Sequence, residues 1–134
     1  MYNAKKRRSR AFQWRDEVGK FIYSKKIPVN GWRFSVTGDG GPSAPGFDDS
    51  KWPLIKSGQL LGKINEFVWI RNRVVIPRDF AGGRVILHIN LDAPGAIFGQ
   101  RGLVFVDGKE TVGLDRHHKE VPLAERARGG EKLS

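Results

Sequence analysis

The dipeptide Asp107-Gly108 lies between the runs VFV and KETVG and constrains how this part of the chain folds. A two-residue type I′ turn needs positive φ at both central positions, and Asp-Gly is one of the pairs that supply it. The flanking valine, phenylalanine and threonine residues favour strands. The sequence therefore predicts a β-hairpin centred on residues 107 and 108.

Three other segments have the composition of strands, namely WRFSV, FVWIRNRVVIP and RVILHINL. The second ends at Pro77, which cannot continue a ladder of backbone hydrogen bonds. Alternation in the third predicts a core face with Val85, Leu87, Ile89 and Leu91, and a wetter face with Ile86, His88 and Asn90. The 17 glycines and 7 prolines supply many turns, including an exposed, mobile loop at 37–46. The expected fold is all-β, an antiparallel β-sandwich or jelly roll.

The N-terminal part differs in composition from the rest. Residues 1–8 are interpreted as a basic flexible tail, and residues 9–27 as one amphipathic helix with a linker. The helix prediction rests on apolar residues at helical spacing, which are Ala11, Trp14, Val18, Phe21 and Ile22. Residues 28–134 are assigned to the β-sandwich.

The positive charge is concentrated at the N-terminus. Five of the 24 basic residues lie in the first ten positions, so residues 11–134 carry 19 basic and 14 acidic side chains, a net charge of +5 rather than +10. A solvated tail is favoured over a nucleic-acid-binding stripe, although binding of another polyanion or contact with a partner domain stays open. No nucleic-acid partner is predicted.

Length and missing residue types exclude several classes of protein. A chain of 134 residues suits one domain, and the lack of any apolar run of about 18 residues predicts no membrane partner. No secretory signal is visible, so a soluble, cytoplasmic protein is expected. The absence of cysteine excludes disulfides, thiolate zinc sites and cysteine nucleophiles.

The segment GFDDSKW is predicted to form a surface turn. Asp48, Asp49 and Ser50 are turn-forming residues, and Phe47 and Trp52 are expected to fix the turn to the core on either side. The carboxylates of Asp39, Asp48 and Asp49 suit calcium, but their spacing does not match an EF-hand, and no metal site is predicted. For Trp32, Trp52 and Trp69, core packing is favoured over stacking on a sugar.

The segment LDRHHKEVPL holds the other candidate site residues. The simplest interpretation is a turn at 113–115 capped by Asp115, with His118 and Glu120 on the polar side of a strand. The other side of that strand would carry Val121 and Leu123. A metal site is disfavoured because adjacent histidines on a strand point to opposite faces. Asp115 and Glu120 could converge across the loop as a catalytic carboxylate pair, but no surrounding motif indicates this.

Several motifs together resemble a known family. FDDSKWP, FVWIRNRVVIP, AGGRVILHINL, LVFVDGKETVGLD and HKEVPL occur in the order found in the jelly-roll, galactose-binding-like domains of glycoside hydrolases. The ending GLDRHHKEVPLAERARGGE most resembles the N-terminal domain of family 38 alpha-mannosidases, and the resemblance extends from residue 9 onward. The chain departs from that family at Asp107, where asparagine is common, and at the insertion-like DAPGAIFGQRG.

The resemblance implies a non-catalytic N-terminal accessory domain of an alpha-mannosidase, an enzyme of carbohydrate metabolism. Its expected partner is the catalytic domain of the same polypeptide, which in the family carries zinc and an aspartate nucleophile. The chain ends at Ser134 without those motifs, so alone it is expected to be no enzyme and to hold no cofactor. Candidate cleft-facing or sugar-contacting residues are Asp115, His118, Glu120 and Trp52.

Two alternative functions belong to other classes. A standalone carbohydrate-binding module would bind α-mannoside glycans, and a basic polyanion-binding protein would use the N-terminal tail. A homo-oligomer is a further partner to be considered.

Overall fold

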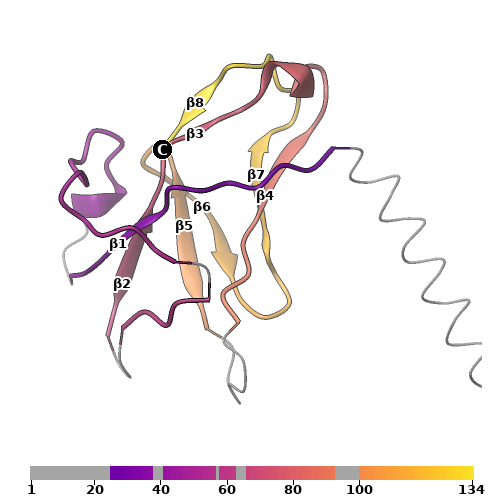
Figure 1. Cartoon of the computed structure of the whole chain (residues 1–134). Helices are drawn as coiled ribbons and strands as arrows, with labels where there is room; N and C mark the ends of the chain where they lie inside the picture. Colours follow the sequence, from indigo (N-terminus) through magenta and orange to yellow (C-terminus); the bar gives the residue numbers. More distant parts are fainter. Residues whose placement is uncertain (1–24, 38–40, 57, 63–65, 93–99) are drawn as a thin grey trace, which may run out of the picture.

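The computed structural model describes residues 25–37, 41–56, 58–62, 66–92 and 100–134. Within these ranges the chain forms eight strands and two short 3-10 helices, in the order β1 (Arg33–Val36), η1 (Gly41–Ser43), β2 (Val68–Arg71), β3 (Val74–Val75), η2 (Arg78–Phe80), β4 (Val85–His88), β5 (Gly102–Val106), β6 (Lys109–Leu114), β7 (Glu120–Ala124) and β8 (Lys132–Leu133) (Figure 1). This confirms the prediction of a β-rich fold. None of the described helices is long and apolar enough to cross a membrane.

Part of the N-terminal prediction lies outside the described residues. The basic tail at 1–8 and the predicted helix as far as residue 24 are among the residues that the structure does not describe. The last part of the predicted helix and linker, residues 25–27, is irregular, exposed chain. From there the chain runs as an extended segment to β1 (Figure 1).

All strand pairing is antiparallel. The pairs are β1 with β2, β3 with β8, β4 with β7, and β5 with β6. In the first pair Phe34 lies opposite Ile70 and Val36 lies opposite Val68. The other edge of β1 contacts the chain at Pro53 and Leu54. There the Phe34 N–H donates to the Pro53 carbonyl at 3.1 Å, and Arg33 forms an isolated bridge with Leu54.

The β5–β6 hairpin confirms the first prediction. Asp107 has φ of 51° and Gly108 has φ of 79°, so both turn residues adopt the positive φ that the Asp-Gly pair indicated. The register shifts between Val104 and Phe105, which marks a β-bulge. The hairpin is therefore regular at its turn, and its strand pairing is interrupted once by the bulge.

Replacing Gly108 with alanine is expected to destabilise the domain by about 1–2 kcal/mol, the cost of placing a side chain in the left-handed region. The added Cβ would also approach Pro45 Cδ to 3.0 Å. Urea denaturation of the 134-residue chain measures the change. Gly46→Ala is the matched control, because nothing lies within 4 Å of its added Cβ; equal effects of the two substitutions would contradict the explanation.

The segment FVWIRNRVVIP forms two strands, β2 and β3, rather than the one strand predicted. The break falls at Asn72 and Arg73. Asn72 Oδ1 accepts a hydrogen bond from the Arg73 N–H at 2.8 Å, and Asn72 Nδ2 donates to the Asn30 carbonyl at 2.9 Å. These side-chain bonds replace the continuous ladder that β-propensity alone predicted.

The segment RVILHINL is a strand only as far as His88. Leu87 pairs with Val121, which is fully buried, and His88 pairs with Glu120. A register shift falls between Val85 and Ile86, where the extra residue is Leu123 of β7. Along β4 itself Val85 is buried and His88 is exposed, as the predicted alternation requires. Beyond the strand, Ile89 N–H donates to the Lys119 carbonyl at 2.8 Å, so the chain stays next to the β6–β7 connection.

The core of the described residues is small. Its central cluster contains Ile76, Val85 and Ala127, packed against half-buried Phe80, Leu123, Ala124 and Leu133. Leu114 and Val121 are the other buried hydrophobic residues. The cluster lies between strands β3, β4, β7 and β8, so the β1–β2 pair is not part of it.

The three described tryptophans are half-buried rather than fully buried. The Trp69 ring lies 5.9 Å from that of Phe105 and joins β2 to β5. Trp52 packs on Phe47 with ring centroids 5.3 Å apart, and Trp32 Nε1 donates to the Val29 carbonyl at 3.0 Å. Each ring has a packing or hydrogen-bonding role in the fold, which is the use that the sequence analysis favoured.

Candidate functional site

Residues 115–119 connect β6 with β7 and contain two of the predicted site residues. Asp115 Oδ1 accepts hydrogen bonds from the backbone N–H groups of His117 at 2.7 Å and His118 at 2.8 Å. The His118 ring nitrogen Nδ1 lies 2.9 Å from the same oxygen. The predicted cap by Asp115 is therefore present, and it also binds the histidine side chain.

Two details of that prediction are wrong. Gly113 and Leu114 are the last residues of β6 and not part of the turn, while His118 lies in the turn and not on a strand. The three hydrogen bonds to Asp115 explain the difference, because they draw residues 117 and 118 back over the carboxylate. The turn is closed by the Asp115 N–H, which donates to the His118 carbonyl at 3.0 Å.

The carboxyl group of Asp115 is held in its ionised form. The hydrogen bond from the His118 side chain, followed by the backbone N–H groups of His117 and His118, lowers the pKa of Asp115 to about 2. A general acid in glycoside hydrolysis needs a raised pKa. Asp115 is therefore unsuited to donate a proton, and its hydrogen bonds give it a role in ordering the turn.

Replacing Asp115 with asparagine is expected to weaken the acid dependence of stability. A carboxyl group with a lowered pKa in the folded state contributes stability above its ordinary pKa of 3.8, and this contribution is lost as the pH falls toward about 2. Urea denaturation at pH 5, 3 and 2 should show a smaller loss of unfolding free energy for Asp115→Asn than for the natural chain. If the unfolding free energies of the two proteins fall by the same amount between pH 5 and pH 2, the prediction is contradicted.

The other two predicted site residues lie elsewhere. Glu120 is exposed at the start of β7, opposite His88. Trp52 belongs to the segment after η1 and contacts Phe47. Within the described ranges no three His, Cys, Asp or Glu side chains gather as they would around a metal ion.

A buried ionic cluster that the sequence analysis missed surrounds Asp49. Asp49 Oδ2 accepts a hydrogen bond from Arg71 Nε at 3.2 Å, and Oδ1 accepts one from Arg73 Nη1 at 2.8 Å. The side chains of Asp49 and Arg71 are 4% and 6% exposed, whereas that of Arg73 is 55% exposed. Asp49 does begin the predicted turn, since the Trp52 N–H donates to its carbonyl at 3.0 Å, but its side chain is buried and not at the surface.

Arg71 also binds several backbone and side-chain groups around the cluster. It donates to the carbonyls of Pro42 and Ala44, and its Nη2 donates to Ser134 Oγ at 3.0 Å. Its guanidinium carbon lies 5.5 Å from the centre of the Phe47 ring. One arginine of β2 therefore joins the η1 segment, the 47–52 segment and the C-terminal residue.

The charges in this cluster compensate one another. Burial raises the pKa of Asp49, but hydrogen bonds from Arg73 and Arg71 outweigh it, and the net pKa is lowered. Both carboxylate oxygens face guanidinium groups, which excludes Asp49 as a calcium ligand in this arrangement. Asp48 is exposed and accepts the Ser50 N–H at 3.0 Å, while Asp39 lies outside the described residues.

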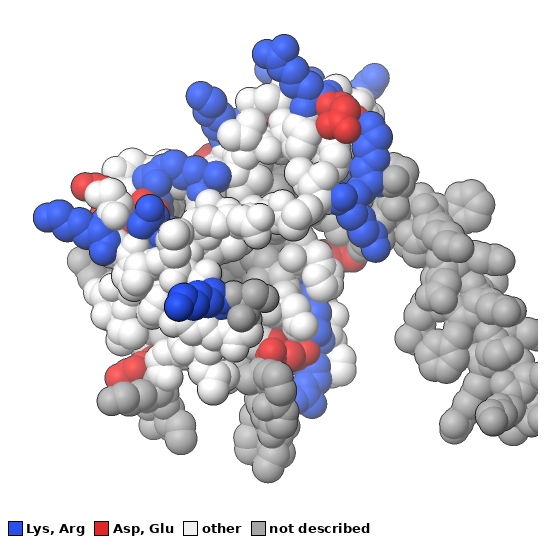
Figure 2. All heavy atoms as spheres, viewed as in Figure 1, with Lys and Arg blue, Asp and Glu red and all other residues white. Residues whose placement is uncertain are grey.

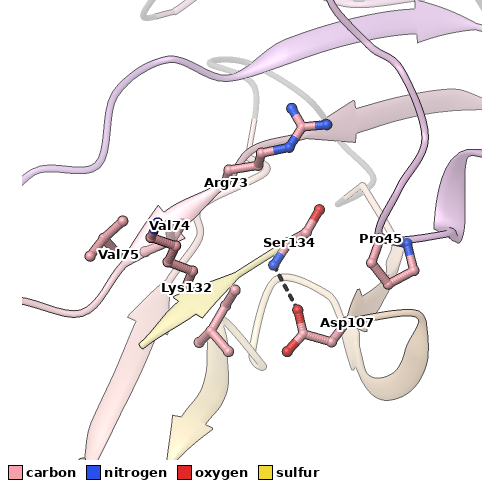
Figure 3. A pocket seen from close by; sticks show the side chains of 8 residues that line it. Pro45, Arg73, Val74, Val75, Asp107, Lys132 and Ser134 are labelled. Carbon is pink, nitrogen blue, oxygen red and sulfur yellow. Dashed lines mark hydrogen bonds between the residues drawn. The ribbon is translucent and has the colours of Figure 1, made fainter. Parts of the chain in front are cut away.

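A pocket of about 280 Å³ lies beside this cluster (Figure 3). It is lined by Pro45, Arg73, Val74, Val75, Asp107, Lys132, Leu133 and Ser134. Its one carboxylate, Asp107, accepts the Ser134 N–H at 2.9 Å. The pocket therefore lacks the pair of carboxyl groups that glycoside hydrolysis requires.

Comparison with models of known families matches residues 33–134 to the family described as alpha-mannosidase, jelly roll domain. This range contains all eight described strands. The chain belongs to this family. The resemblance to an alpha-mannosidase jelly-roll domain is thereby confirmed for residues 33–134, which form the jelly-roll domain of this chain. Its extension back to residue 9, the assignment to family 38 and the galactose-binding-like character stay predictions.

A curated relative comes from a different class of protein. The jelly-roll domain is similar to an A-type ATP synthase subunit from Haloferax volcanii, with 29% identity over 104 residues. The match covers 70% of this chain but only 17% of the relative. No solved structure matches the chain.

Proposed function

We propose that the jelly-roll domain is the non-catalytic N-terminal accessory domain of an alpha-mannosidase that acts on α-mannosides in carbohydrate metabolism. The observation that carries the proposal is the family match over residues 33–134. In the proposed enzyme, catalysis and zinc binding belong to a separate domain of the same polypeptide. The jelly-roll domain packs against that catalytic domain. Its four strand pairs together form the β-sandwich.

The state of the acidic residues supports a non-catalytic role. Asp115 is ionised and bound by His118, and Asp49 is buried between Arg71 and Arg73. Both have lowered pKa values, which is opposite to the shift that a general acid needs. Proton transfer by either acid would break the hydrogen bonds that its carboxylate makes within the fold.

Exposed apolar side chains support packing against another domain. On and beside β1 and β2, Phe67 is 79% exposed, Val36 is 51% exposed and Ile70 is 37% exposed. Val36 lies opposite Val68, and Val68 and Ile70 are two residues apart on β2. Because side chains alternate between the faces of a strand, Val36 and Ile70 lie on the same face. Contact with a neighbouring domain would bury this face and stabilise the assembly.

An activity assay tests the proposal. The 134-residue chain should not hydrolyse an aryl α-mannoside, whereas the enzyme encoded by the continuing reading frame should hydrolyse it. Removing residues 1–134 from that enzyme is expected to lower its stability or expression. Turnover by the 134-residue chain alone, or a reading frame that encodes no glycosidase, would contradict the proposal.

Sugar binding by the domain itself is the alternative function. Candidate contacts are Trp52, Glu120 and the Asp115–His118 turn, but Trp52 already packs on Phe47. NMR titration with methyl α-mannoside at millimolar concentration should leave the Trp52 and His118 resonances unchanged. Saturable shifts would support a carbohydrate-binding module, and sedimentation of the same sample would show whether the chain forms a homo-oligomer.

A further inference from the structure

Ser134, which follows β8, is bound to the turn of the β5–β6 hairpin. The Ser134 N–H donates to Asp107 Oδ1 at 2.9 Å, and the Asp107 N–H donates to the Ser134 backbone carbonyl at 2.8 Å. Figure 3 shows the first of these bonds between the end of β8 and the turn. One turn residue therefore binds both backbone polar groups of Ser134.

A third hydrogen bond reaches Ser134 from another strand. Arg71 Nη2 of β2 donates to Ser134 Oγ at 3.0 Å. The Arg71 side chain is 6% exposed and pairs with buried Asp49. We call the three bonds from Asp107 and Arg71 to Ser134 the Ser134 anchor. It joins the residue after β8 to two other strand pairs.

Both partners in the Ser134 anchor have fixed positions. Gly108 of the turn packs so closely on Pro45 that an added Cβ would lie 3.0 Å from the Pro45 Cδ. Arg71 Nη1 donates to the Ala44 carbonyl at 3.1 Å, so it contacts the same segment after η1. The turn and the arginine are thus held by a common segment and do not move independently of it.

The pairing of β8 with β3 does not account for the anchor. That pairing comprises Lys132 and Leu133, and Ser134 lies beyond it. Chain beyond the last paired residue is usually poorly ordered unless other contacts hold it. Because a residue has only two soft backbone dihedrals, bonds to its amide and its carbonyl together fix the direction of the chain there.

We propose that the Ser134 anchor sets the direction in which the chain leaves the jelly-roll domain and thereby orients the catalytic domain. This inference rests on the proposed function, in which the catalytic domain follows in the same polypeptide. Domains joined by a flexible connection move relative to each other unless a large interface prevents it. Asp107 and Arg71 are therefore positioning residues, which act on the catalytic domain through Ser134.

Surface charge does not supply the same constraint on the face shown in Figure 2. Basic side chains occur at several separate places on that face, and acidic side chains lie beside some of them. Such a distribution does not select one orientation of a neighbouring domain. A fixed connection between the domains adds the missing constraint.

Hydrogen exchange of the Ser134 amide in the 134-residue chain tests the anchor itself. Asp107→Gly removes the carboxylate acceptor, while glycine keeps the positive φ of the turn. Exchange should become about tenfold faster, the effect of losing a hydrogen bond to a charged group. Asp107→Asn keeps an acceptor oxygen and tolerates the same φ, so its exchange should be slower than that of Asp107→Gly.

Electron paramagnetic resonance distances in the full enzyme test the orientation of the catalytic domain. The chain has no cysteine, so Lys51→Cys gives a single label site at an exposed position of residues 1–134, and a second label is placed on the catalytic domain. The distance distribution should be narrow in the natural enzyme and in Asp107→Asn, and broader in Asp107→Gly. Glu110→Ala removes an exposed acid of the same hairpin and should leave the distribution narrow.

Two results would overturn the inference. Equal exchange rates of the Ser134 amide in the natural chain and Asp107→Gly would show that the carboxylate does not hold it. A distribution that stays narrow in Asp107→Gly would show that the anchor does not orient the catalytic domain. If Asp107→Gly does not fold, Ser134→Ala gives the same test, because it removes the Arg71 bond and leaves the turn unchanged. The proposed function fails separately, if the reading frame encodes no glycosidase.

Discussion

Asp49→Ala is expected to destabilise the jelly-roll domain by about 3–5 kcal/mol, because removing one partner of a buried ion pair leaves the other charge uncompensated. The Arg71 side chain is 6% exposed and would face the emptied site. Its hydrogen bonds to the Pro42 and Ala44 carbonyls would remain, but these are neutral acceptors. The loss should therefore exceed that of an exposed ion pair, which is about 0–1 kcal/mol.

Urea denaturation of the 134-residue chain measures this effect as a lower midpoint with an unchanged slope. Asp48→Ala is the matched control, since Asp48 is the neighbouring acid and is exposed. Its loss should be much smaller than that of Asp49→Ala, because Asp48 is exposed and its side chain accepts only the local Ser50 N–H bond of the turn. If both alanine variants lose the same free energy, Asp49 is not the centre of the cluster. Asp49→Asn should fall between them, because an amide keeps the shape and one acceptor oxygen.

Local features of the fold are predictable from the sequence, and the β5–β6 hairpin is the best example. The backbone preferences of Asp107 and Gly108 predict the turn, and two hydrogen bonds between Asp107 and Ser134, which the sequence did not predict, add to its stability. The cap by Asp115 has the same local origin, because its acceptor reaches the N–H groups two and three residues further on.

The features that sequence reasoning missed depend on residues far apart in the chain. The break between β2 and β3 involves the bond from Asn72 to Asn30, which is 42 positions away. Asp49 and Arg71 are 22 positions apart, and nothing in the pattern FDDSKW shows that its second acid is buried. Two arginines in the strand-forming segment WIRNRVV were the available signal, since a charge in a buried strand needs a partner.

The predicted site residues illustrate the same limit. Asp115 and His118 are three positions apart, and the turn between them brings the side chains together. Trp52 and Glu120 were grouped with them by residue type; in the structure Trp52 packs on Phe47, and Glu120 lies opposite His88 at the start of β7. Side-chain type alone therefore does not predict which residues lie close together, because this depends on the pairing of distant strands.

Ile76→Ala is the second substitution with a large expected effect. Ile76 is 1% exposed and forms the central cluster with Val85 and Ala127. Replacing a buried isoleucine with alanine removes favourable burial and leaves a cavity, which together cost about 2–5 kcal/mol. Urea denaturation should therefore show a loss comparable to that of Asp49→Ala.

Val75→Ala separates the effect of burial from that of the strand. Val75 is the neighbouring residue of β3 and is 53% exposed, so its loss should stay below about 1 kcal/mol. Ile76→Val should cost about 0.5–1.5 kcal/mol, because only one methylene group is removed. The backbone bonds of Ile76 to Glu131 and Gly130 persist in all three variants, so they cannot account for the order. A loss at Val75 equal to that at Ile76→Ala would show that the pairing of β3 with β8, and not the core, holds this end of the domain together.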